Sequence, residues 1–233
     1  MLKFEKLIFG DLGWGDEFLI AMLMTILVSI LAMCLGIILA IFTAWAKVSY
    51  SKVLSIIANF YTTIVRGIPE LLVIYLIFFG GSALLMKIAK IFGYNGYIEL
   101  NALVISIIAI GIISATYSSE VLRAAYLSVP KGQVEAAKSL GLSRWNTFYK
   151  ILSPQILRHA IPGIGNVWQI TLKDTSLISV TGLVEIMRMS YIAAGSTRDP
   201  LFFYSFAAVL YLFLTFLSMK LFNKLEKHYS RGH

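Results

Sequence analysis

Long runs of apolar residues are the first feature of this chain. Residues 18–46 carry no charged side chain and are followed by Lys47. Residues 100–122 and 201–222 form two further runs that are almost free of charge. A helix needs about 20 mostly apolar residues to cross the hydrocarbon core of a bilayer. The pattern therefore predicts a membrane-spanning helix in each of these three segments.

The stretch after the first run is patterned differently. From Val53 to Arg66, apolar and polar side chains occupy opposite stripes of a helix. At about 1.5 Å per residue, this helix is too short to cross the bilayer alone. Pro69 then interrupts it before a second apolar run, residues 71–86. We expect the two pieces to form one broken spanning element.

Residues 156–186 are predicted to form a further span, which is unusually polar. Seven polar side chains lie close together in it: Asn166, Gln169, Thr171, Lys173, Asp174, Thr175 and Ser176. A charge or amide that faces lipid is energetically costly. We therefore expect this span to face a pathway or another subunit, although single polar groups could simply hold neighbouring helices together. With five spans in total, the predicted fold is an all-α integral membrane protein.

Composition and charge agree with a membrane location. The 233 residues are 58% hydrophobic and 14% charged, whereas a soluble domain carries about 25% charged residues. A net charge of +8 would suggest nucleic acid as the partner of a soluble protein. In a membrane protein, however, Lys and Arg gather on the cytoplasmic side. Most of the basic residues do so if the N-terminus is outside and the C-terminus is cytoplasmic, which is the predicted orientation. No nucleic-acid partner is expected.

Residues 130–154 are predicted to form two short basic helices in the cytoplasm, between the third and fourth spans. Pro130 can begin the first helix, and Gly141 suits the left-handed turn that ends it. Ser143 can cap the second helix, and Pro154 is expected to stop it.

This loop also offers a small-residue face, formed by Ala136 and Ala137, that a partner could approach closely. Its sequence resembles the loop signature of type I ABC importer permeases. The resemblance rests on Glu135-Ala136-Ala137, on Gly141 after three further residues, and on Ile151 and Pro154. Ser153 stands where that family commonly has Leu.

The resemblance extends over nearly the whole chain. Segments similar to polar amino-acid permeases are residues 61–71, 129–133, 161–169 and 172–177. The likeness is strongest to the permeases for histidine, lysine, arginine and ornithine, and to those for opines. The resemblance implies a type I ABC importer permease fold and transport of amino acids, with a preference for basic amino acids or opines.

The resemblance also implies an assembly in the bacterial inner membrane. Residues 18–226 would form the transmembrane domain, between an extracytoplasmic segment, residues 1–17, and a cytoplasmic tail, residues 227–233. The implied partners are a second permease subunit (a paralogue or a second copy), two ATP-binding-cassette ATPase subunits, an extracytoplasmic substrate-binding protein and membrane lipids. ATP and Mg²⁺ would bind to the ATPase. The loop residues expected to dock on the ATPase are Gly132, Glu135, Ala136, Ala137, Gly141, Leu142 and Ser143.

No segment of the sequence has the pattern of an enzyme active site. The P-loop GxxxxGK[ST] does not occur, so any ATP chemistry must belong to another chain. No cluster of His, Cys or carboxylates has metal-ligand spacing, and there is no nucleophile elbow. We therefore expect this chain to be a transport subunit that holds no metal or cofactor of its own.

A few charged residues near the predicted membrane core are candidates for specific contacts. Glu120 and Arg123 are three residues apart and are predicted to form a structural ion pair. Glu70 follows Pro69 at the break, where an acid is frequent in the basic-substrate relatives and would attract a cationic side chain. Alternatively, Glu70 pairs with Arg66, four residues earlier. The side chains expected along a substrate path are Asn59, Thr62, Glu70, Asn166, Gln169 and Asp174.

Two other functions fit the sequence less well. One is an ion-coupled secondary transporter that works without an ATPase and uses Glu70, Glu120 or Asp174 as proton carriers. Five spans without an internal repeat are few for such a protein, because these transporters are commonly built from inverted repeats. The other is a non-transporting assembly or signalling subunit, which would not need a polar fourth span.

Overall fold

The computed structural model describes residues 6–10, 13–94, 96 and 100–230, and this part of the chain is helical and contains no strand. Four segments are long and apolar enough to span a membrane: α1 (Gly15–Val48), Glu70–Ile91, α5 (Ala102–Ser128) and α10 (Pro200–Ser230). A fifth span is obtained by counting residues 144–181 together with α9 (Ile186–Thr197), which meet at an angle of 50°. The predicted all-α membrane fold with about five spans is confirmed.

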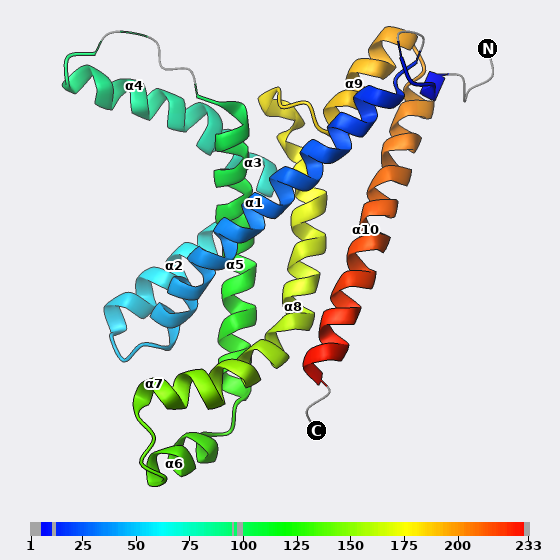
Figure 1. The fold of residues 1–233 in the computed structure, drawn as a ribbon. Helices are drawn as coiled ribbons and strands as arrows, with labels where there is room; N and C mark the ends of the chain where they lie inside the picture. Colours follow the sequence, from blue (N-terminus) through cyan, green and yellow to red (C-terminus); the bar gives the residue numbers. More distant parts are fainter. Residues whose placement is uncertain (1–5, 11–12, 95, 97–99, 231–233) are drawn as a thin grey trace.

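The helices divide the molecule into two ends (Figure 1). The N-terminal segment, α9 and the start of α10 lie together at one end, which we call the α9 end. α6 (Lys131–Ser139) and α7 (Arg144–Thr147) lie at the opposite end, which we call the loop end, as does the last turn of α10. α1 crosses α5 in the middle of the molecule, and α4 (Gly81–Ile91) extends away from the other helices.

The segment predicted to form one broken span divides differently. α2 (Lys52–Gly67) is a separate helix of 16 residues. After Pro69 the chain forms α3 (Glu70–Tyr75), the π-helix η2 (Leu76–Gly80) and α4 as one helical segment. Because no breaking residue follows Met86, this segment reaches a length of 22 residues and can cross a bilayer without α2.

The polar fourth span also differs from the prediction at both ends. Pro154 does not stop a helix, because α7 continues through the π-helix η3 (Phe148–Leu152) into α8 (Ser153–Asp174). Pro154 lies in the first turn of α8, where a missing N–H costs little, and follows a wide π-turn. The span ends after the 3₁₀-helix η4 (Thr175–Thr181), where Gly182 has a left-handed φ of 87°. Residues 156–186 are therefore not one helix.

The crossing of α1 and α5 depends on small residues. A Cβ atom at Gly36 would lie 1.9 Å from Ser114 Oγ and 3.2 Å from the Gly111 carbonyl oxygen. Membrane helices use such residues to bring their backbones close, since lipid gives no hydrophobic force between them. The buried core beside the crossing consists of Val28, Ala32, Val73, Ile74, Ala109, Ile110, Ile113 and Ile178. This contact holds α5, which carries Tyr117 and Glu120, in a fixed position.

Substitution of Gly36 by Leu should therefore destabilise the protein. The larger side chain cannot fit between α1 and α5, so overpacking should cost about 1–3 kcal/mol and lower the thermal unfolding temperature in detergent. Gly81→Leu is the matched control, because nothing lies within 4 Å of a Cβ atom at Gly81. Equal unfolding temperatures for the two variants would contradict this account of the crossing.

Candidate functional site

A group of charged side chains joins three helices toward the loop end. Glu120 of α5 accepts a hydrogen bond from Lys47 Nζ of α1 at 2.5 Å and another from Arg123 Nε at 3.0 Å. Arg66 of α2 places Nη1 3.9 Å from the same carboxylate. The Lys47 side chain is only 1% exposed. Since an unpaired charge away from water is very costly, Lys47 requires Glu120 as its counter-charge.

The contact predicted between Glu120 and Arg123 is thus present, but it belongs to a larger group. We call Lys47, Arg66, Glu120 and Arg123 the basic cluster. It contains three cations around one carboxylate, and its side chains come from α1, α2 and α5. A simple ion pair on one helix face would stabilise only that helix, whereas this arrangement fixes three helices relative to one another.

α2 is held against the rest of the molecule largely by polar contacts. Lys47 Nζ donates to Thr62 Oγ1 at 2.6 Å, and the Tyr61 hydroxyl donates to the Ile112 carbonyl oxygen at 2.7 Å. Only Ala58 and Thr62 are buried in this helix. Its large apolar side chains are exposed, namely Val53, Leu54, Ile56, Ile57, Phe60 and Ile64. With these apolar side chains exposed, α2 suits an environment of lipid or of another subunit.

Two carboxylates lie in the region where α3 begins and α8 ends. Glu70 is the first residue of α3, and its Oε1 accepts a hydrogen bond from the Tyr117 hydroxyl of α5 at 3.0 Å. Asp174 is the last residue of α8, and the charges of Glu70 and of Lys173 act on its carboxylate with opposite sign. We call Glu70 and Asp174 the acidic pair. Carboxylates that repel each other favour a cation beside them.

The alternative prediction, a Glu70–Arg66 ion pair, is not what the structure shows. No ion pair joins these two side chains in the described part of the chain. The Arg66 guanidinium lies over the Tyr117 ring, 5.3 Å from its centroid, and faces Glu120. Ile68 and Pro69 have extended backbone conformations, so Arg66 and Glu70 do not share a helix face despite their spacing.

The other side chains expected along a path do not join the acidic pair through hydrogen bonds. Thr62 is 2% exposed, and its hydroxyl is occupied by Lys47, so it serves packing. Asn59 and Asn166 are exposed, and Asn59 donates to the carbonyl of its own helix at Ser55. Gln169 Oε1 is buried and has no hydrogen-bond partner among the described residues.

Sequence reasoning missed three residues that hold the helices together. Lys47 was interpreted only as a flanking charge, and Tyr117 gave no signal because it lies in an apolar run. Glu185 is fully buried and caps α9, since its carboxylate accepts from the backbone N–H groups of Met187 and Arg188 at 2.7 Å. The Tyr211 hydroxyl of α10 also donates to it, at 2.9 Å. The signal for this cap in the sequence was an acidic residue, Glu185, three residues after Gly182 and directly before apolar residues.

The loop between α5 and α8 has the turn predicted for it. Gly141 has φ of 74°, its N–H bonds to the Lys138 carbonyl at 2.9 Å, and the next N–H, of Leu142, bonds to the Ala137 carbonyl at 3.1 Å. This pair of bonds is a Schellman motif, which ends α6. Ser143 Oγ accepts from the Asn146 N–H at 3.2 Å and so caps α7.

The small-residue face of α6 needs one correction. Ala137 is 1% exposed and packs inside the loop, so it cannot meet a partner directly. The exposed residues on one side of α6 are Gly132, Glu135, Ala136 and Ser139. The loop also exposes four large apolar side chains, those of Leu140 (80%), Trp145 (75%), Tyr149 (70%) and Phe148 (46%).

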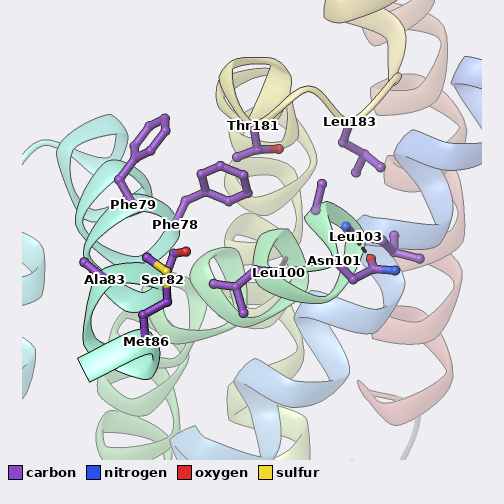
Figure 2. A pocket seen from close by; sticks show the side chains of 11 residues that line it. Phe78, Phe79, Ser82, Ala83, Met86, Leu100, Asn101, Leu103, Thr181 and Leu183 are labelled. Atoms are coloured by element: carbon purple, nitrogen blue, oxygen red, sulfur yellow. Dashed lines mark hydrogen bonds between the residues drawn. The ribbon is translucent and has the colours of Figure 1, made fainter. Parts of the chain in front are cut away.

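One cavity has neither residue of the acidic pair in its lining. It has a volume of about 820 Å³ and lies between the α3–α4 segment, the start of α5 and the turn after η4, as Figure 2 shows. Its lining is mostly apolar, with Phe78, Phe79, Met86, Leu100, Leu103 and Leu183, and includes no charged side chain. Such a lining does not suit the charged groups of an amino acid. In the described part of the chain, no group of three His, Cys, Asp or Glu residues could hold a metal ion.

Comparison with known proteins places these features in a family. Residues 32–231 match the family model described as binding-protein-dependent transport system inner membrane component. The chain is 50% identical to the nopaline transport system permease protein of Agrobacterium fabrum, over 96% of this chain and 95% of that protein. It is 36% identical to the histidine/lysine/arginine/ornithine transport system permease protein of Escherichia coli, over 94% of this chain and 96% of that protein.

Solved structures agree with this assignment. A crystal structure of an amino acid ABC transporter with histidines has a chain that is 28% identical, with a TM-score of 0.77, over 92% of this chain and 95% of that one. The methionine ABC transporter in an inward-facing conformation has a chain with the same fold at 15% identity, with a TM-score of 0.74, over 93% of this chain and 98% of that one. The chain therefore belongs to the family of inner membrane components of binding-protein-dependent transport systems.

Proposed function

We propose that this chain is the permease subunit of an ATP-driven importer that carries basic amino acids or opines across the inner membrane. The observation that carries the proposal is the acidic pair, Glu70 and Asp174, which lies among spanning helices and has a hydrogen-bond donor, Tyr117, but no direct cationic partner at Glu70 in the described part of the chain. A carboxylate so placed suits a cationic side chain on the transported molecule.

The relatives support the same substrate class. The names of the matched permeases refer to nopaline, to octopine, to histidine, lysine, arginine and ornithine, and to arginine. In a partly desolvated path, a charge pair at 4 Å is worth about 4 kcal/mol at an effective dielectric constant of about 20. Membership of this family gives no support to ion-coupled secondary transport or to a non-transporting subunit.

The proposed assembly contains a second permease subunit, two ATPase subunits that bind ATP and Mg²⁺, and an extracytoplasmic binding protein. The exposed apolar faces of α2 and of α4, which has no buried residue, support coverage by lipid and by the second permease. The exposed Leu140, Trp145 and Tyr149 support docking of a partner at the loop, because large apolar side chains on a protruding loop favour a covered surface.

The loop is built to pass motion to the acidic pair. At one side it follows α5, which carries Tyr117 and Glu120. At the other side, α7 is continuous with α8, whose last residue is Asp174. Movement of the docked loop would therefore displace two of the helices that bear the proposed path. In this proposal residues 18–226 form the transmembrane domain and residues 130–154 the ATPase-docking loop.

Changes in the loop should uncouple the ATPase. Gly141→Val forces a β-branched residue into a left-handed conformation, whereas Gly141→Asn keeps one that Asn tolerates. We expect the Val variant to lose most ATPase co-purification and transport, and the Asn variant to retain both. Glu135→Arg, on the exposed side of α6, should weaken the docked complex. Wild-type transport with bound ATPase in both Gly141→Val and Glu135→Arg would refute the docking role.

The proposed orientation places the α9 end outside and the loop end in the cytoplasm. Cys34 is exposed, so the test starts from Cys34→Ala. New cysteines at Gly10, Tyr94 or Gly195 should react with an impermeant thiol reagent applied to intact cells. Asn146→Cys should react only after permeabilisation; it is preferred to Ser143, whose side chain caps α7. Labelling of Asn146→Cys in intact cells would reverse the orientation.

Glu70 should determine the preference for a cationic side chain. Binding of arginine and of citrulline, its neutral analogue of similar shape, is compared on the purified complex without the binding protein. Glu70→Gln should weaken arginine binding by about tenfold or more, equivalent to about 1.4 kcal/mol, and change citrulline binding little. Glu226→Gln, in the exposed last turns of α10, is the matched control. An unchanged arginine-to-citrulline ratio in Glu70→Gln would exclude Glu70 from substrate selection.

A further inference from the structure

Arg66 lies between two acidic sites. Its Nη1 is 3.9 Å from Glu120 Oε1, and its guanidinium covers the ring of Tyr117. The hydroxyl of that same ring donates to Glu70 at 3.0 Å. The Arg66 side chain is 44% exposed, so it is free to change rotamer. Because this hydroxyl contacts Glu70, a rotamer change that carries the guanidinium along the ring would bring it toward Glu70.

The charges around Arg66 differ in sign on its two sides. On one side, Glu120 attracts it, while Lys47 and Arg123, which already bind Glu120, repel it. On the other side stands the acidic pair, whose carboxylates repel each other and would both gain from a cation. The position of Arg66 therefore depends on the charge of Glu120. Without that charge, only repulsion would remain at the basic cluster, and it would push Arg66 toward Glu70.

From this arrangement we infer that Arg66 is a tethered competitor for the acidic pair, and that Glu120 is the positioning residue that keeps Arg66 away from Glu70. The inference rests on the proposed function, in which the acidic pair receives the cationic group of the substrate. A guanidinium on α2 has the same chemistry as the side chain of arginine. If it were released, it would occupy Glu70 and exclude cationic substrates, while neutral substrates would be affected little.

The test compares arginine and citrulline binding to the purified complex in four forms: wild type, Glu120→Gln, Arg66→Gln and the double variant. Glu120→Gln should weaken arginine binding by about tenfold relative to citrulline, because one charge contact at Glu70 is then taken by Arg66. The double variant should recover the wild-type ratio, because no tethered guanidinium remains. Arg66→Gln alone should bind arginine at least as tightly as the wild type.

The double variant separates positioning from a structural role. If Glu120 only held the helices together, removing Arg66 as well could not restore the preference for arginine. An unchanged ratio in Glu120→Gln, or a loss that persists in the double variant, would overturn the inference. Glu120→Gln could fail to fold, because it leaves Lys47 buried without its counter-charge. In that case the double variant Lys47→Gln/Glu120→Gln removes both charges. Its arginine-to-citrulline ratio is then compared with and without Arg66→Gln. Glu226→Gln again serves as the control.

Failure of this inference can be told apart from failure of the proposed function. If Glu70→Gln loses the preference for arginine while Glu120→Gln keeps it, the acidic pair selects the substrate and only the role of Glu120 and Arg66 is wrong. If Glu70→Gln itself leaves the preference unchanged, the proposed substrate site is wrong, whatever Glu120→Gln does.

Discussion

A positive charge buried at the end of a membrane helix has to find its counter-charge inside the protein. Lys47 closes the apolar part of α1 and meets this requirement at Glu120 of α5 and at the Thr62 hydroxyl of α2. Because the same carboxylate also binds Arg123 and attracts Arg66, one contact sets the positions of α1, α2 and α5. The buried Lys47 ammonium and the Glu120 carboxylate are therefore the centre around which these three helices are arranged.

The bilayer explains the rest of the polar architecture. Backbone groups are satisfied within the helices, so the remaining polar side chains turn toward protein, and large apolar side chains turn outward. In α2, the hydroxyl groups of Thr62 and Tyr61 contact α1 and α5, while large apolar side chains are exposed. At the other end of the molecule, the buried Glu185 carboxylate caps α9 and also accepts a hydrogen bond from the Tyr211 hydroxyl. Both of its oxygens are therefore hydrogen-bonded within the protein.

Much of the fold could be predicted from the sequence, because long apolar runs have few alternatives. The loop turn was also predictable, since Gly141 and Ser143 act through local backbone geometry. The errors arose where local rules give way to context. Pro154 stops a helix in general but not in a first turn after a π-turn. The spacing of Arg66 and Glu70 suggests a pair only if one helix contains both, and the extended Ile68–Pro69 link prevents that. Lys47 and Tyr117 act through partners far away in sequence, which no local pattern reveals.

Because α7, η3 and α8 are continuous, a small movement of the loop would be transmitted along α8 as a larger displacement of its far end. The helical path turns between α7 and the upright part of α8, and α8 contains Pro162 in its interior (Figure 1). The 22 residues of α8 extend about 33 Å at 1.5 Å per residue. A tilt of about 10° at the base of such a rod displaces its far end by about 6 Å. Asp174 stands at that far end, so in the proposed importer a small tilt of α8 would move Asp174 relative to Glu70.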